Sequence, residues 1–473
     1  MCHRAFSKIE CTMSESELDR YKKWVFGCTF VNYAMSHWTR KSYTNVKEQM
    51  MTAGVSAYIL AAMDSGFMFT YAGGSFITGA LGDRFSPTKV IAIGLLGSSV
   101  VLFLIVLGAS SPMIAESASV GLIWFAGVQI IHGFFQATGG PVNTAIMNNW
   151  FPKEGRGAIF GLWTMHQYVG DIVAAFAGAW ILSSPLNWRM AIVIPLVING
   201  IWSIINFVAV PATPEEVGLK KDQKLPLSAQ EAKSLAAEPP SEDRPITYAE
   251  AFGAPNVMNY AIAFGFFKLI NYAMFFQLPV ILASNFDSAT ANLISSLYSF
   301  GMMPGGYICG KVSDIYGGRR ACVCATMMAI LVPLLIFFAY FMDSLDVVFL
   351  LVMLCIMGTL VGGPNNIITS AVAADIADAF GSKAAGTITG IINGSGSVTA
   401  AGGQLLIPIF SAWGEADGVG YRYVWLFLVF CTVVGTLCLY PKIKKELAPT
   451  VVASGGAYQA VATRAPTRGS TIM

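Results

Sequence analysis

Long apolar stretches alternate with short polar segments along almost the whole chain. Twelve of these stretches are long enough to cross a bilayer as helices, because a helix rises about 1.5 Å per residue and the hydrocarbon core is about 30 Å thick. They fall into two groups of six. The pattern predicts helices over residues 24–43, 54–81, 88–109, 120–150, 157–183 and 189–210, and then over 256–284, 290–313, 320–342, 346–374, 385–413 and 421–440.

The polar segments divide the chain into five parts. Residues 211–253 are rich in Lys, Glu, Pro and Ala and offer too little apolar surface to fold alone, so they predict a flexible linker. We expect an N-terminal segment (1–23), a six-helix half (24–210), the linker, a second six-helix half (254–441) and a disordered tail (442–473). The predicted fold is an all-α polytopic membrane protein built from two pseudo-symmetric six-helix bundles.

Composition agrees with this prediction and excludes other classes of protein. Of the 473 residues, 55% are hydrophobic and only 12% are charged, whereas a soluble domain carries about 25% charged residues. The sequence contains no GxxxxGK[ST] motif, so we expect no nucleotide hydrolysis. Since no combination of nucleophile, base and orienting group is recognisable either, an enzyme is not expected. We also expect no cofactor, no metal and no nucleic acid partner.

The distribution of charge predicts the orientation of the chain in the membrane. Lys and Arg gather at alternate ends of the spans, whereas the opposite loops carry acids such as Glu116, Asp287 and Asp346. Because an excess of Lys and Arg marks cytoplasmic loops, both termini and the linker are predicted to be cytoplasmic.

Two motifs recur in the two halves of the chain. The stretch GALGDRFSPTK after the second span is echoed by CGKVSDIYGGRR after the eighth, and GGPVNTAI in the fourth span by GGPNNIIT in the tenth. The same offset makes Arg40 in the first half the approximate counterpart of Lys268 in the second. Two repeats with matched cations are typical of a transporter that binds its substrate between the halves.

Lys268 lies in the middle of the span over residues 256–284. A charge near the bilayer midplane costs at least about 2.5 kcal/mol unless it faces water, a counter-charge or a ligand. Two interpretations remain open. Lys268 binds an anion together with Asn271 and Tyr272 on the same helical face, or it forms a structural ion pair with one of the intramembrane acids, Asp64 or Asp171.

The first span places Tyr33, His37 and Arg40 on one helical face. The guanidinium group of Arg40 offers a fork of donors that matches two phosphate oxygens, but its position along the helix is equally compatible with a side chain that reaches the far membrane interface. His166 in the fifth span is either a ligand or a hydrogen-bonded structural histidine. The fourth span carries a polar stripe that either lines a cavity or joins helices: Gln129, His132, Gln136 and Asn143.

Several stretches carry a resemblance to a known family. The pair GDRFSPTK and SDIYGGRR resembles the loop motif of the major facilitator superfamily. The stretches HWTRKSYTNVK, HGFFQATGGPVNTAIMNNWFPKEGRGAIFGLWTMHQYVG, FFKLINYAMFFQLP, GGPNNIITSAVAADI and GTITGIINGSGSV resemble the organophosphate:phosphate antiporters, in particular the eukaryotic sugar-phosphate exchangers of the glucose-6-phosphate transporter group. The resemblance implies exchange of a sugar phosphate, of the glucose 6-phosphate or glycerol 3-phosphate class, for inorganic phosphate by alternating access. It further suggests the endoplasmic reticulum membrane, with the plasma membrane or another internal membrane as alternatives.

The resemblance and the spacing together predict the residues of two sites. The loop residues, expected to act as latches between helices, are Asp83, Arg84, Asp314, Arg319 and Arg320. The substrate-binding residues are Arg40, Lys268, His166, Tyr33, His37, Asn271, Tyr272, Asn365 and Asn393.

The chain also departs from the pattern of the family. The bacterial relatives have an arginine at the position best aligned with Asn271. The family usually has tryptophan where this chain has Gly140 and Gln277, asparagine at Thr164 and aspartate at Asn393. These changes alter the polar lining of the expected cavity, so the organic part of the substrate is the least determined feature.

Two other functions remain open at this stage. One is a proton-coupled carrier of another organic anion that uses Asp64 or Asp171. The other is a sensor that has the same fold and does not transport.

Overall fold

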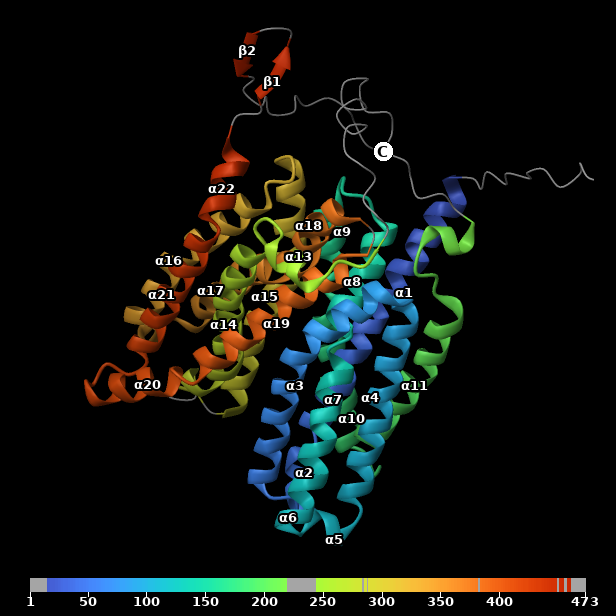
Figure 1. Cartoon of the computed structure of the whole chain (residues 1–473). Helices are drawn as coiled ribbons and strands as arrows, with labels where there is room; N and C mark the ends of the chain where they lie inside the picture. The colour runs from blue at the N-terminus through green and yellow to red at the C-terminus, as the bar shows by residue number, and fades with distance from the viewer. Residues whose placement is uncertain are drawn as a thin grey trace, which may run out of the picture.

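The computed structural model is almost entirely helical. It describes residues 15–218, 244–282, 285–286, 288–381 and 383–448, together with residues 451–454 and 457–460. Figure 1 shows two groups of helices side by side, the first half of the chain in blue to green and the second in yellow to red. Each predicted span corresponds to a helix or to a series of shorter helices in these two groups.

The first half contains the elements up to the beginning of the linker. They are α1 (Glu15–Thr44), α2 (Lys47–Thr52), α3 (Ala57–Arg84), α4 (Pro87–Ala109), α5 (Pro112–Ala115), α6 (Ala118–Gly121), η1 (Leu122–Ala126), α7 (Gly127–Gln136), α8 (Gly139–Trp150), α9 (Arg156–Trp163), α10 (His166–Leu182), α11 (Met190–Ala209) and η2 (Pro214–Val217).

The second half contains the elements from the end of the linker to the tail. They are α13 (Tyr248–Gly253), α14 (Val257–Leu282), α15 (Ser288–Ile315), α16 (Arg320–Phe341), η3 (Met342–Ser344), α17 (Val347–Ile367), η4 (Ile368–Val372), α18 (Ala373–Ala377), η5 (Asp378–Phe380), α19 (Ala385–Gln404), α20 (Ile407–Ala416), α21 (Arg422–Cys438), α22 (Tyr440–Leu447), β1 (Val451–Ser454) and β2 (Ala457–Ala460).

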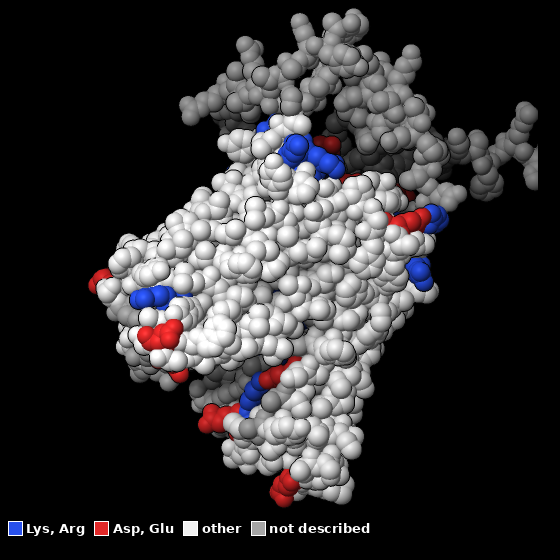
Figure 2. Space-filling view, turned by 60° about the vertical axis from the view of Figure 1, so that its left-hand side comes forward, with Lys and Arg blue, Asp and Glu red and all other residues white. Residues whose placement is uncertain are grey.

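The surface has the character expected of a protein that lies in a bilayer. Figure 2 shows a broad belt of the molecule almost without charged side chains, with Lys, Arg, Asp and Glu gathered towards its two ends. By length and apolar composition alone, five helices of the described residues are able to cross a membrane, or six if α21 and α22, which are bent by 48° to each other, form one span. Other spans are shorter or more polar. For example, α10 has 17 residues, and α19 is rich in glycine, serine and threonine.

The segments outside the spans contain more structure than expected. α1 begins at Glu15, within the predicted N-terminal segment, and the expected linker ends in the helix α13. The predicted disordered tail does not hold for residues 442–447, which belong to α22, nor for β1 and β2, which pair in antiparallel fashion with Val451 opposite Ala460. The rest of the tail and linker residues 219–243 lie outside the described residues.

A capping box explains why α13 forms within a polar linker. The side chain of Thr247 accepts a hydrogen bond from the backbone of Glu250, and the Glu250 carboxylate accepts one from the Thr247 backbone at 2.8 Å. Arg244 also donates to this carboxylate, and these bonds lower the pKa of Glu250 to about 2. The Thr-x-x-Glu spacing is a sequence signal for the beginning of a helix, so α13 was predictable.

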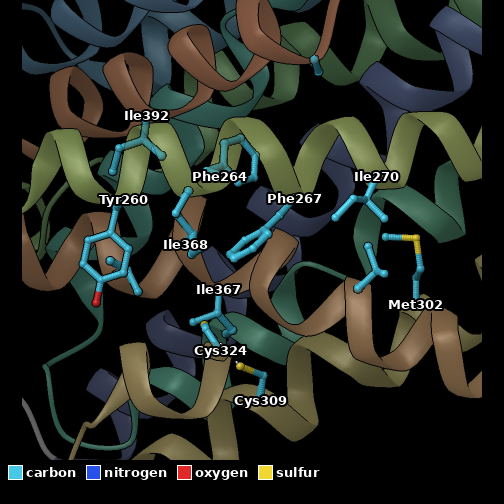
Figure 3. Close-up of a cluster of buried hydrophobic side chains, with 14 of the residues drawn as sticks. Tyr260, Phe264, Phe267, Ile270, Met302, Cys309, Cys324, Ile367, Ile368 and Ile392 are labelled. Carbon is cyan, nitrogen blue, oxygen red and sulfur yellow. Dashed lines mark hydrogen bonds between the residues drawn. The ribbon is translucent and has the colours of Figure 1, made fainter. Parts of the chain in front are cut away.

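The core of the second half is built around α14. Figure 3 shows Tyr260, Phe264 and Phe267 of this helix, which lie among Ile367, Ile368 and Ile392 from neighbouring elements. Tyr260, Phe264 and Phe267 are each at most 2% exposed. Close packing of large apolar side chains fixes the rotation of α14, and therefore the direction of its polar side chains.

Among the contacts between the two halves, the most extensive are those of α3 with α19, α9 with α15 and α8 with α19. The first two bring backbones closest together. Glycines allow the backbones to approach at both places. A Cβ atom on Gly79 of α3 would overlap the carbonyl group of Gly386, and one on Gly310 of α15 would overlap that of Gly157. Both contacts lie towards the end of the molecule that carries the beginning of α1 and α22, which we call the terminus end (Figure 1). At the opposite end, Figure 2 shows a hollow between the halves.

The contact at Gly79 leads to a test of how the halves pack. Gly79→Ala should destabilise the closed terminus end by about 1–3 kcal/mol, because the added methyl group must displace backbone of the other half. Thermal unfolding of the purified protein in detergent measures the effect as a lower midpoint. Gly73→Ala is the control, because Gly73 is exposed on the same helix and an added Cβ meets no atom within 4 Å. Equal midpoints for the two variants would contradict this packing.

Candidate functional site

Two cations, one from each half of the chain, approach the same aromatic ring. Arg40 of α1 has its Cζ atom 4.7 Å from the centre of the Tyr71 ring, and Lys268 of α14 has its Nζ atom 5.9 Å from that centre. Tyr71 itself belongs to α3. The structure therefore brings together Arg40 and Lys268, which the repeat suggested as counterparts.

Lys268 is held by neutral acceptors. Its side chain is buried, and Nζ donates to Oδ1 of Asn393 at 2.9 Å and to Oγ of Ser397 at 2.7 Å. The Asn393 amide in turn donates to Oγ of Ser75, on α3 of the other half, at 3.2 Å. The ammonium charge thus has hydrogen-bond partners, while no carboxylate forms an ion pair with it within the described parts of the chain.

The alternative interpretation of Lys268 as half of a structural ion pair is wrong. Asp64 forms its ion pair with Lys47 at 2.5 Å, and it also accepts from the Tyr43 hydroxyl. Asp171 pairs with His37 at 3.2 Å. Both candidate acids therefore have partners within the first half, and neither of them forms an ion pair with Lys268.

Arg40 lies in the interior of the bundle and not at a membrane interface. Its guanidinium group stacks on Phe67 at 5.2 Å as well as on Tyr71, and Nη2 lies 3.5 Å from Oε1 of Gln136. The buried Nε atom has no hydrogen-bond partner among the residues described. The interpretation of Arg40 as an interface anchor is therefore wrong, and part of its donor fork is unpaired.

His166 and Tyr33 lie beside these cations in a cluster of rings. The His166 ring is 4.3 Å from that of Tyr33 and 4.5 Å from that of Trp163, and the Tyr33 hydroxyl is 3.5 Å from the Tyr71 hydroxyl. Although His166 is 3% exposed, neither of its ring nitrogens has a partner within the described residues. Its interpretation as a hydrogen-bonded structural histidine is therefore wrong. A buried, unpaired polar group of this kind requires an explanation, and a ligand is one.

The remaining predicted binding residues differ in how they are placed. The Tyr272 ring lies 5.6 Å from Nζ of Lys268, whereas Asn271 accepts from the Tyr298 hydroxyl at 3.4 Å, within the second half. Oδ1 of Asn365 is buried without a partner in the described part of the structure. Its neighbour Asn366, which the sequence pattern did not single out, accepts from Gln167 of the other half at 3.1 Å.

Two aspartates hold the halves together at the terminus end. Asp83 of α3 accepts from the backbone of Gly386 at 2.9 Å, where α19 of the other half begins. Asp314 of α15 accepts from the backbone of Gly157 at 3.1 Å and of Ala158 at 2.8 Å, where α9 begins. A carboxylate stabilises a helix N-terminus because it satisfies free N–H groups and meets the positive end of the helix dipole. The recurring loop motifs thus form a reciprocal pair of contacts.

An arginine that the sequence analysis did not select completes this contact. Arg156 is buried at the beginning of α9 and donates to Asp375 at 3.1 Å and to Asp378 at 2.8 Å, both in the second half. The signal in the sequence was a cation at the start of one span and acids at the end of another, on the same side of the membrane.

The other basic loop residues have different places from those expected. Arg320 bonds to Asp375 and Asp314, so it acts within the second half, and Arg319 is the N-cap residue of α16. Arg84 is exposed, and no ion pair of Arg84 occurs in the described residues. The expected latch role therefore does not extend to Arg84.

Two helical halves that close on each other at one end, with cations from both at the centre, define a membrane carrier. The sequence pattern of the Major Facilitator Superfamily matches residues 26–404 and 285–465. "Sugar phosphate exchanger 3" of Mus musculus is 30% identical over 474 residues, which cover 89% of this chain and 93% of that protein. "Glucose-6-phosphate exchanger SLC37A2" of Mus musculus is 30% identical over 426 residues, which cover 84% and 81%.

Solved structures agree on the fold. The proton:xylose symporter XylE bound to 6-bromo-6-deoxy-D-glucose has a TM-score of 0.66 at 14% identity, over 90% of this chain and 96% of that one. The human organic anion transporter MFSD10 has a TM-score of 0.62 at 16% identity, over 88% and 99%. The chain belongs to the Major Facilitator Superfamily and, within it, to the family of the sugar phosphate exchangers. The predicted family and two-bundle membrane fold are confirmed, and the chain is a transporter and not an enzyme.

Removal of the buried arginine should open the terminus end. Arg156→Gln leaves Asp378 without its cation and leaves Asp375 with Arg320 alone. Loss of one partner from a fully buried pair costs about 3–5 kcal/mol, which is the upper limit here because Asp378 is 34% exposed. Spin labels at the exposed positions Phe85 and Ala379, in a cysteine-free background, should then report a longer distance between the halves.

Lys153→Gln provides the matched control for this experiment. It removes an exposed positive charge three residues before Arg156 and should leave the distance between the labels unchanged. An unchanged distance in Arg156→Gln as well would show that this ion pair does not keep the terminus end closed.

Proposed function

We propose that this carrier exchanges a phosphorylated sugar for inorganic phosphate, and that the phosphate group binds between Arg40 and Lys268. The observation that supports this most directly is the approach of one cation from each half to Tyr71, with no ion pair to a carboxylate for either cation in the described residues. The relatives named above are called exchangers of sugar phosphate and of glucose 6-phosphate. We extend that substrate class to this chain as part of the proposal.

The chemistry of the two side chains suits a phosphate group. A guanidinium fork donates two parallel hydrogen bonds to phosphate oxygens, and an ammonium group adds a compact charge without demanding a particular geometry. The unpaired ring nitrogens of His166 offer one further donor or acceptor. Asn365, with its buried and unpaired Oδ1, is the candidate for a sugar hydroxyl.

Electrostatics couples binding to the movement of the halves. Without an anion, Arg40 and Lys268 repel each other across a region of low dielectric constant, where like charges interact strongly. A phosphate group carries a charge of about −1.5 to −2 at neutral pH and offsets both cations. The halves then close around the ligand, whereas the empty carrier reorients poorly. A carrier with this property exchanges one anion for another and does not catalyse net flow.

The orientation and the membrane form a further part of the proposal. The excess of Lys and Arg supports a cytoplasmic position for both termini and the linker. The closed terminus end is then the cytoplasmic end, and the hollow in Figure 2 faces the opposite compartment. The endoplasmic reticulum is the membrane we propose, on the basis of the family alone.

One observation favours a second candidate, a proton-coupled carrier of another organic anion. His37 pairs with Asp171 at 3.2 Å, and both lie within the membrane region close to Arg40. A titratable pair beside the anion site is a possible route for protons. Uptake that requires a pH gradient and no phosphate on the other side would support this candidate over exchange.

Neutral substitution of either cation tests the proposed binding site. Arg40→Gln and Lys268→Gln should each reduce phosphate-for-phosphate exchange in reconstituted vesicles by about 10- to 100-fold, because a hydrogen bond to a charged group contributes about 1.5–3 kcal/mol. Lys23→Gln is the control, since it removes an exposed cation of α1 and should leave exchange unchanged. Undiminished exchange by both site variants would remove the model.

Counterflow identifies the organic substrate. Vesicles loaded with labelled phosphate should release it in exchange for external glucose 6-phosphate or glycerol 3-phosphate, since each carries the dianionic group that the two cations bind. Unphosphorylated glucose is the control and should cause no release. Release driven equally well by glucose would contradict recognition through phosphate, and release by phosphoenolpyruvate alone would exclude a sugar phosphate.

A further inference from the structure

A chain of buried amides and one imidazole lies behind Arg40, on α7. Gln129, His132 and Gln136 follow one another along this helix, and each is at most 2% exposed. These residues belong to the polar stripe of the fourth predicted span. Another member of the stripe, Asn143, accepts from Asn32 of α1 at 3.0 Å and so joins two helices. The other three are connected to each other, and the connection leads to Arg40.

Two hydroxyl groups that act as hydrogen-bond acceptors fix which way the amide of Gln136 points. Its Nε2 atom lies 3.0 Å from the Thr39 hydroxyl and 3.3 Å from the Ser98 hydroxyl. Both hydroxyl groups already use their single proton on backbone carbonyl groups, Thr39 on that of Met35 and Ser98 on that of Gly94. They are therefore acceptors here, so the amide nitrogen faces them. The oxygen of Gln136 is left to face Nη2 of Arg40 at 3.5 Å.

The same reasoning fixes the proton on His132. Nε2 of His132 lies 3.2 Å from the amide nitrogen of Gln136. That nitrogen has two protons, one directed at Thr39 and one shared between Ser98 and His132, and it cannot accept a hydrogen bond, so Nε2 of His132 carries no proton and is an acceptor. The ring proton is therefore on Nδ1, which donates to Oε1 of Gln129 at 2.8 Å. Gln136 thus donates to His132, and His132 donates to Gln129.

His132 also supports the second contact of Arg40. Its ring meets the Phe67 ring edge to face, with centres 5.4 Å apart. Phe67 also contacts the Arg40 guanidinium group at 5.2 Å and stacks on Tyr71. One imidazole thus touches both the amide and the aromatic ring that hold Arg40, without touching Arg40 itself. A planar guanidinium binds two oxygens only in one orientation, so its supports determine how well it binds.

We infer that His132 is a positioning residue for substrate binding: it holds the oxygen of Gln136 towards Arg40 and so sets the plane of the guanidinium group. This inference rests on the proposed role of Arg40 as a phosphate ligand. The side chain that replaces His132 must then offer an acceptor at the position of Nε2, whereas size alone is not sufficient.

Three substitutions separate this role from simple packing. His132→Leu keeps an apolar side chain and lacks an acceptor, and His132→Asn reaches only the position of Nδ1, so both should raise KM for phosphate exchange about tenfold with little change in maximal rate. His132→Gln places an amide oxygen near the position of Nε2 and should restore KM to within about threefold of the original value. Comparable thermal midpoints in detergent show that all three variants fold.

A double-mutant cycle with Arg40→Lys gives the decisive readout. An ammonium group has no plane to orient, so His132→Leu should cause no further rise in KM when position 40 is lysine. An equal rise in both backgrounds would overturn the inference, as would failure of His132→Gln to restore KM or an unchanged KM in both His132→Leu and His132→Asn. The proposed function fails separately, if Arg40→Gln alone leaves phosphate exchange unchanged.

Discussion

The structure depends on two like charges inside a membrane protein, neither of which forms an ion pair with a carboxylate in the part of the chain that the structure describes. Arg40 rests on aromatic rings, and Lys268 rests on the oxygen atoms of Asn393 and Ser397. These neutral partners reduce the cost of burial and leave the net charge of the centre positive. A carboxylate in their place would have neutralised the site and removed its attraction for an anion. The acids of this region are instead committed elsewhere, Asp64 to Lys47 and Asp171 to His37.

The contact between the halves also satisfies polar groups that would otherwise be unpaired, namely free backbone N–H groups at the beginnings of helices. Each half inserts an aspartate into the start of a helix of the other, and glycines let the backbones touch where these aspartates lie. Caps of this kind are polar and depend on geometry, so a rotation of the helices relative to each other would remove their hydrogen bonds. Apolar packing within each half, as around α14 in Figure 3, keeps the halves themselves rigid. Rigid-body movement of one half against the other requires rigid halves and a contact between them that can be broken.

Local side chains connect the charged centre to the interface. Asn393 binds Lys268 with its oxygen and Ser75 of the opposite half with its nitrogen, so the arrangement of the halves and the position of the ammonium group are linked. Behind Arg40, hydroxyl groups already bonded to backbone carbonyl groups determine how Gln136 is turned. In both places the oxygen and the nitrogen of one neutral amide group bind different partners. The position of the cation is therefore coupled to the position of the group at the other end of the amide.

The amino-acid sequence by itself determined the membrane-spanning segments, the division into two halves, the repeat between them and the family membership. Each of these features follows from hydrophobic periodicity or from motifs that are contiguous in the sequence. It also brought out Arg40, Lys268, Asp83 and Asp314 as unusual charges. It could not decide whether Lys268 faces an acid, and it did not reveal Tyr71 as the ring that both cations approach. Nor did it reveal that Asn366 and Arg156 form contacts between the halves. Those contacts join residues far apart in sequence, and the rotation of each helix about its axis is set by packing against its neighbours. Only the tertiary structure, which fixes those rotations, decided which of the charges in the described residues form ion pairs and which do not.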